Sequence, residues 1–138
     1  MPGSYTIGIR PTILFKSILM LTNEEIKKFA AADDFHIAPY REDGITTGTP
    51  TWIWSVMVRD QLFVRAYHGA HSKWYQAALK QKAGKIEGAG LVKTVEFAPV
   101  TGTILEEIDE AYRRKYSKSP YLSSMINAQA KAATMRVI

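Results

Sequence analysis

The sequence of 138 residues contains no cysteine. Disulfide bonds and thiolate metal sites are therefore excluded, and we expect the chain to work in a reducing compartment, with the cytoplasm as the default. A chain of this length buries about two-thirds of its unfolded surface, so it needs no covalent or metal staple in order to fold. We predict one small domain.

Long hydrophobic runs are also missing. The longest apolar stretch near the start, residues 13–21, is interrupted by Lys16 and Ser17, and it is much shorter than the roughly 20 residues that cross a bilayer. No convincing small-residue cleavage site of a signal peptide follows it. We expect no membrane anchor. We interpret residues 1–19 as an N-terminal tail or a misassigned translation start, and residues 20–138 as the domain.

Several catalytic motifs are absent as well. The sequence has no G-x-S-x-G elbow, no GxxxxGK[ST] phosphate loop and no GxGxxG fingerprint, so nucleophilic hydrolysis, ATP hydrolysis and a Rossmann site have no support. The histidines at positions 36, 68 and 71 fall short of a zinc pattern, because a His-x-x-His pair in a loop has no fixed carboxylate partner. We predict no metal site.

Negative charge is scarce in the middle of the chain. The formal net charge is +5, which favours anionic partners such as nucleotides, phosphates or nucleic acids. Residues 61–86 contain no Asp or Glu. Their basic residues are Arg65, Lys73, Lys80, Lys82 and Lys85, with His68 and His71 among them. The basic excess is therefore local, in one stretch of the chain.

Hydrophobic periodicity predicts helices alternating with short strands. Capping boxes, in which a threonine is followed three residues later by a glutamate, open helices at Thr22 and Thr103. Ser72 is expected to cap a third helix that ends near Gly84. A short helix is predicted around residues 121–128. Alternation of apolar residues predicts strands over residues 35–40, 51–58, 62–67, 85–87, 91–97 and 132–138.

Two details of these elements bear on the structure. Both faces of the strand over residues 51–58 are apolar, so we expect that strand to lie in the centre of its sheet. In the helix that begins at Thr103, residues 109 and 113, and likewise 110 and 114, are spaced as i, i+4 ion pairs.

Hairpins separated by helices argue against a doubly wound parallel sheet. The predicted fold class is therefore α+β, a small antiparallel split β-barrel of about six strands with helices at its ends.

The segment over residues 67–75 is the best candidate site. A strand that carries Arg65 turns through Gly69 and enters a helix at Ser72 and Lys73, so free backbone N–H groups, a hydroxyl and two cations converge. We expect the Arg65 guanidinium to leave the strand beside this turn. The alternative is that Arg65 and the lysines form an ordinary solvated face and that Trp74 and Tyr75 belong to the core.

Residues 67–75, YHGAHSKWY, resemble the strand–loop–helix of the split-barrel flavin proteins. In members like pyridoxamine-phosphate oxidase, a serine with Arg and Lys at this turn grips the phosphate of flavin mononucleotide (FMN). In the deazaflavin-dependent nitroreductase branch, a glycine and then His-Pro-x-Trp-Tyr-x-Asn-Leu occupy it. Against that second pattern the matches are His71, Trp74 and Tyr75, and the departures are Ser72 for Pro, Ala77 for Asn and Ala78 for Leu.

A longer stretch, residues 40–121, is similar to a bacterial family catalogued only as domain of unknown function 2255. The resemblance is carried by TPTWIW at residues 49–54, LFVR at residues 62–65 and AYRRKY at residues 111–116. It implies no activity.

The flavin resemblance implies a split barrel of the FMN-binding type that holds FMN or a deazaflavin. By extension, it implies an oxidoreductase whose substrate is unknown. It implies that Arg65, Ser72 and Lys73 hold the phosphate. It also implies a homodimer. The residues it assigns to the cofactor site are Trp52, Trp54, Ser55, Arg65, Tyr67, His71, Ser72, Lys73 and Trp74.

Two alternatives stay open. Aromatic residues interleaved with bases near Lys73 are compatible with a nucleic-acid-binding module, although the strands are too apolar for an open stacking platform and no RNA-binding signature is present. A split barrel that has lost its cofactor is the other alternative, because Ala77 stands where the nitroreductase pattern has an asparagine.

Overall fold

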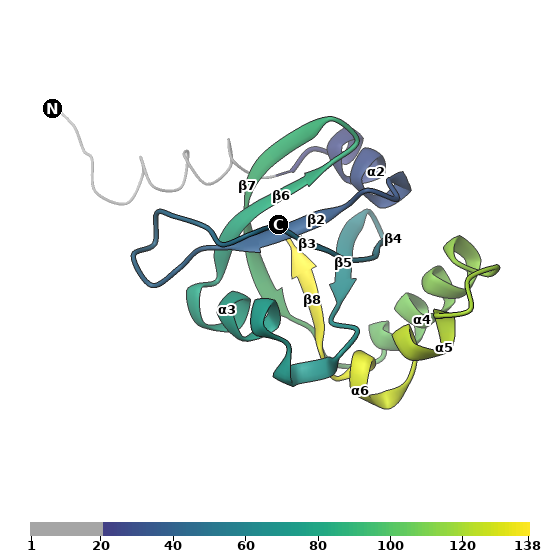
Figure 1. Ribbon diagram of the computed structural model, residues 1–138. Helices are drawn as coiled ribbons and strands as arrows, with labels where there is room; N and C mark the ends of the chain where they lie inside the picture. Colours follow the sequence, from purple (N-terminus) through teal and green to yellow (C-terminus); the bar gives the residue numbers. More distant parts are fainter. Residues whose placement is uncertain (1–20) are drawn as a thin grey trace, which may run out of the picture.

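The computed structural model describes residues 21–138 (Figure 1). Helix α2 (Asn23–Ala31) begins at the predicted capping box: the Thr22 hydroxyl accepts from the Glu25 N–H at 3.1 Å, and the Glu25 carboxylate accepts from the Thr22 N–H at 2.9 Å. Phe29 on this helix is fully buried. The capping box is therefore confirmed, whereas the predicted tail over residues 1–19 lies outside the described residues.

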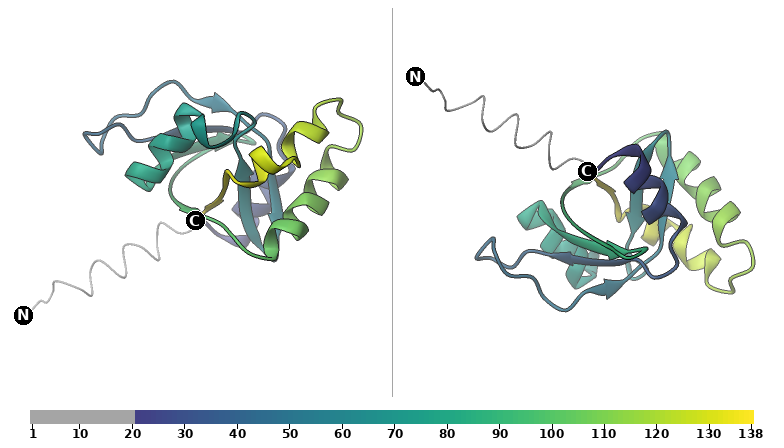
Figure 2. Two further views of the ribbon diagram at one scale, coloured as in Figure 1. Left: turned by 90° about the horizontal axis from the view of Figure 1, so that it is seen from below. Right: turned by 90° about the horizontal axis from the view of Figure 1, so that it is seen from above.

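Seven strands of the described chain form one antiparallel sheet, which curls into a half-barrel (Figures 1 and 2). Their order across the sheet is β3-β2-β6-β7-β8-β5-β4. This confirms the α+β class, and the curled sheet is consistent with a split barrel. The strands are β2 (His36–Pro39), β3 (Thr51–Trp52), β4 (Ser55–Val58), β5 (Gln61–Arg65), β6 (Ala83–Gly88), β7 (Leu91–Pro99) and β8 (Thr134–Val137).

Strand β7 joins the two halves of the half-barrel. Residues 91–96 pair with β6, whereas residues 97–99 pair with β8. The predicted hairpins β4–β5 and β6–β7 are both present. In the first hairpin the turn residues Arg59 and Asp60 both have positive φ angles, 51° and 60°, which match the right-handed twist of the paired strands.

The prediction of one central strand over residues 51–58 is wrong. The segment divides into β3, which pairs with β2, and β4, which pairs with β5, so the two pieces lie at opposite ends of the sheet. Both faces of β4 are apolar because helices pack on it and not because strands flank it. On one side, Val56 and Val58 of β4 pack with Phe63 and with residues of the C-terminal helices.

Helix α3 (Lys73–Gln81) and the group α4 (Ile104–Lys115), α5 (Leu122–Met125) and α6 (Ala128–Lys131) lie on opposite flanks of the curled sheet (Figure 2). The short 3-10 helix η1 (Gly69–His71) precedes α3. Among residues 21–138, no helix is long and apolar enough to cross a bilayer.

Two clusters of buried side chains follow from the alternation along the strands. Leu62 and Val64 of β5 point into the curl, where they pack with residues such as Met135 of β8. Phe63, between them in sequence, points the other way, toward Ile108 of α4. Arg65 lies on the same side of β5 as Phe63, and this places it under the C-terminal helices.

Helix α4 begins where predicted, but its polar contacts differ from the prediction. The Thr103 side chain makes no capping hydrogen bond, and the Glu106 carboxylate instead pairs with Lys131 at 2.8 Å. Asp109 does not pair with residue 113, because it is buried and contacts Arg65 and Lys131. Tertiary partners have therefore replaced the expected contacts of Glu106 and Asp109, whereas Glu110 pairs within the helix with Arg113 and not with residue 114.

Candidate functional site

A pocket of about 490 Å³ lies where the β3–β4 connection, the end of β5, the start of α3 and helix α5 meet. Its volume falls within the range of small-molecule sites. We call it the aromatic pocket. Its lining consists of Thr51, Trp52, Ile53, Trp54, Arg65, Tyr67, His68, Ser72, Trp74, Tyr121 and Met125.

Five of the eleven lining residues are Trp or Tyr, and the lining contains no carboxylate. The chain has three tryptophans, at positions 52, 54 and 74, and all of them line this pocket. Trp52 and Tyr121 are each 58% exposed at the rim. A second hollow of about 530 Å³ lies between residues 40–42 and α3, but its lining includes the solvated ion pair of Lys80 and Glu42, so we place the candidate site in the aromatic pocket.

Six of the nine residues that the sequence assigned to the site line this pocket, and three do not. Ser55 is buried elsewhere, and its hydroxyl donates to the Phe29 carbonyl at 2.9 Å. His71 and Lys73 flank Ser72 in sequence but are not part of the lining. The six that line it are Trp52, Trp54, Arg65, Tyr67, Ser72 and Trp74.

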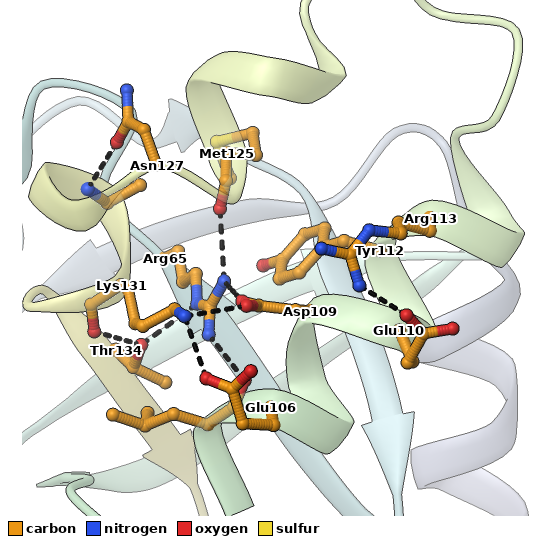
Figure 3. Close-up of polar contacts among 12 residues, drawn as sticks. Arg65, Glu106, Asp109, Glu110, Tyr112, Arg113, Met125, Asn127, Lys131 and Thr134 are labelled. Atoms are coloured by element: carbon orange, nitrogen blue, oxygen red, sulfur yellow. Dashed lines mark hydrogen bonds and ion pairs between the residues drawn. The ribbon is translucent and has the colours of Figure 1, made fainter.

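The placement expected for Arg65 is wrong. Its guanidinium does not leave the strand beside the turn but is fully buried, and it forms an ion pair with Asp109 of α4 (Figure 3). It also donates to the Thr134 hydroxyl at 2.9 Å and to the carbonyls of Met125 and Leu105 at 3.1 and 3.0 Å. Four of its five N–H donors are therefore used by the protein.

Arg65 is buried because it lies on the side of β5 that faces the C-terminal helices. Asp109 receives a second cation there, Lys131, whose Nζ is 2.8 Å from the Asp109 carboxylate and 2.8 Å from that of Glu106 (Figure 3). The hydrogen bond to Asp109, followed by that to Glu106, raises the pKa of Lys131. The result is a charge-balanced network behind the pocket.

Trp54 is held from behind by α4. Its ring stacks on that of Tyr116, with centroids 3.9 Å apart and planes 7° apart, and its carbonyl accepts from the Tyr112 hydroxyl at 2.8 Å. Burial raises the pKa of both tyrosines. Both phenols thus remain neutral donors over the physiological range, and the Trp54 wall of the pocket is rigidly supported.

The start of α3 forms another wall. Ser72 is the N-cap residue, as predicted, but its side chain makes no capping hydrogen bond. The first N–H groups of the helix consequently receive no side-chain acceptor from the cap position. Gly69 lies in the turn that precedes α3. A glycine is needed at this position, because its φ is 77° and an added Cβ would collide with the Gln129 side chain. Ser72 therefore lines the pocket next to a helix N-terminus.

Five lining residues are not among the nine that the sequence assigned to the site: Thr51, Ile53, His68, Tyr121 and Met125. His68 lies in the candidate segment over residues 67–75 but was not among the nine assigned residues, and its position beside Tyr67 was the available signal. Tyr121 and Met125 come from a segment far from the loop in the sequence, so no local pattern could find them. Within residues 21–138, no group of three or more His, Asp or Glu residues could hold a metal ion.

The fold and the pocket together define a small α+β half-barrel with an aromatic, carboxylate-free site between its sheet and its C-terminal helices. The chain belongs to a family of uncharacterized proteins conserved in bacteria (DUF2255), whose pattern matches residues 25–137. This confirms the closer of the two resemblances. No curated protein matches the sequence.

Proposed function

We propose that the aromatic pocket binds the ring system of a flavin or a deazaflavin, with the phosphate of the ligand at the start of α3. The observation that carries this proposal is the gathering of all three tryptophans with Tyr67 and Ser72 around one pocket. The resemblance of residues 67–75 to the split-barrel flavin proteins points in the same direction.

The ring is expected to lie among the tryptophans. Flat aromatic ligands gain from offset stacking and edge-to-face contacts with indole and phenol rings. Trp54 is stacked from behind by Tyr116, so its pocket face is presented without the loss of rotamer freedom that an unsupported side chain would suffer on binding. When bound, the ring would supply electron or hydride transfer, and the protein would supply grip and orientation.

The phosphate is assigned to Ser72, Lys73 and the free N–H groups of α3. A helix N-terminus stabilises an anion through its unpaired N–H groups and its dipole. Lys73 is exposed in the first turn of α3, where a cation is unfavourable unless an anion is nearby. Arg65 contributes support from behind, since Asp109 already neutralises its charge.

The absorption spectrum of the purified protein, alone and after incubation with FMN or a deazaflavin followed by removal of free ligand, tests this function. We expect one of the two chromophores to remain with the protein at a ratio near one per chain. A parallel titration with short single-stranded DNA over a salt series separates the nucleic-acid alternative, because polynucleotide binding weakens steeply with salt. Tight, salt-sensitive DNA binding without flavin binding would overturn the proposal.

A further inference from the structure

His68 is the one residue of the aromatic pocket whose type ordinarily changes charge between about pH 5 and 8. It follows Tyr67 at the end of β5, its ring lies edge-on to that of Tyr67 with centroids 5.0 Å apart, and it is exposed. Within residues 21–138, no hydrogen bond reaches its ring nitrogens. His36 differs, because its Nδ1 contacts the Asp34 carbonyl at 2.8 Å.

Among residues 21–138, no carboxylate forms an ion pair with His68, and the lining of its pocket contains no Asp or Glu. From β5, the neighbouring charged group is Arg65, which is neutralised by Asp109. The 3-10 helix η1 adds His71 and the start of α3 adds Lys73, both outside the lining, and from the C-terminal helices the titratable group of the lining is the Tyr121 phenol. Asp109 itself lies behind Arg65 and contacts Lys131. An imidazolium at position 68 therefore lacks a protein anion.

We propose that His68, in its protonated form, binds the anionic group of an aromatic ligand in this pocket, so that the affinity for such ligands depends on pH. An anion beside the ring nitrogens would accept a charge-assisted hydrogen bond and supply the missing counter-charge. At pH values where the imidazole of the free protein is neutral, binding would then be accompanied by uptake of a proton by His68. This inference rests on the pocket being a ligand site, as proposed above, but not on the ligand being a flavin.

The test uses two dyes with nearly the same ring system, anilinonaphthalene sulfonate and the uncharged phenylnaphthylamine. The sulfonate keeps its negative charge over the whole range of imidazole titration, so any pH dependence of its binding comes from the protein. Excitation transfer from the three tryptophans to the dye reports that the dye is bound, and a difference between His68→Gln and His71→Gln assigns the binding to the pocket. Dissociation constants are measured from about pH 5 to 8 for the wild type, His68→Gln and the matched control His71→Gln.

We expect wild-type affinity for the sulfonate to fall by about ten- to a hundredfold as the pH rises, the range for a hydrogen bond to a charged group. His68→Gln should bind it weakly at every pH, His71→Gln should follow the wild type, and phenylnaphthylamine should show no pH dependence with any of the three. Unchanged pH dependence in His68→Gln, equal pH dependence for the uncharged dye, or no transfer to the sulfonate at any pH would each overturn the inference. Failure of flavin alone to bind would instead overturn only the proposed function.

Discussion

The guanidinium of Arg65 on β5 and the carboxylate of Asp109 on α4 form an ion pair whose side chains are 0% and 3% exposed. Together with Met125, Lys131 and Thr134, the pair connects two strands of the sheet with three C-terminal helices (Figure 3). Removal of one partner from such a pair leaves an uncompensated buried charge. Arg65 therefore supports the rear wall of the pocket.

Substitution Asp109→Asn should lower the free energy of unfolding by about 3–5 kcal/mol, because the Arg65 charge would then be buried without its counter-charge. Urea denaturation measures this loss. The matched control is Arg59→Ala, which removes a surface pair with Glu107 whose side chains are 66% and 42% exposed; we expect it to cost about 0–1 kcal/mol. Equal effects of the two substitutions would contradict the role assigned to the buried pair.

Substitution Lys73→Ala should weaken FMN binding by about 1.5–3 kcal/mol, or roughly ten- to a hundredfold, because a cation assigned to the proposed phosphate is lost. Affinity for riboflavin, which has the same ring and no phosphate, should not change. Without ligand the variant should be as stable as the wild type or slightly more so, since a cation near the positive end of the α3 dipole is removed. Lys80→Ala in the last turn of the same helix is the control; equal losses in the two variants would refute the phosphate assignment.

Trp52 tests the contribution of the rim to ring binding. Its indole N–H donates to the Asp33 carbonyl at 2.8 Å, so Trp52→Ala removes both a ring and a hydrogen bond, whereas Trp52→Phe removes the bond and keeps an aromatic ring. We expect Trp52→Ala to weaken riboflavin binding by about 0.5–1.5 kcal/mol and Trp52→Phe to retain most of the affinity. Isothermal titration of both variants with riboflavin measures these affinities. An equal loss of affinity in the two variants would indicate that the aromatic ring at position 52 makes no contribution to binding.

Lys115 predicts a pH dependence of stability. Its Nζ donates to the carbonyls of Ala32 and Ser55 at 2.9 and 2.7 Å, and burial lowers its pKa from 10.5 to about 8. Between these values the unfolded chain holds a proton that the folded chain has released, so the stability of the wild type relative to Lys115→Met should rise as the pH increases from about 8 toward 10.5. Denaturation of both proteins at several pH values tests this. A difference that stays constant or falls would contradict the lowered pKa.

Alternation of apolar residues carried most of what could be predicted about the fold. It assigned Val56 and Val58 to the same side, and both pack with Phe63. It did not reveal that residues 51–58 divide between the two ends of the sheet, because pairing of β3 with β2 is a long-range contact that leaves no local pattern. The apolar outer face of β4 results from helix packing, which a period of two cannot distinguish from a central position.

The sequence brought together those lining residues of the aromatic pocket that lie near one loop or one strand. Trp52, Tyr67 and Trp74 do line one pocket. The role of Arg65 was beyond reach, since its partner Asp109 is 44 positions away and a charged strand residue usually points to solvent. Tyr121 joined the pocket through the packing of the C-terminal helices, which the sequence indicates only as short helical segments.

The most direct test of the account is tryptophan fluorescence during a titration with FMN, with riboflavin in a parallel titration, because every tryptophan of the chain lines the aromatic pocket. We predict that both ligands quench the emission saturably, and that FMN does so at lower concentrations than riboflavin because its phosphate gains the contacts at Ser72 and Lys73. If neither FMN, riboflavin nor a deazaflavin quenches the tryptophans saturably, the pocket does not bind a flavin ring, and the central claim is contradicted.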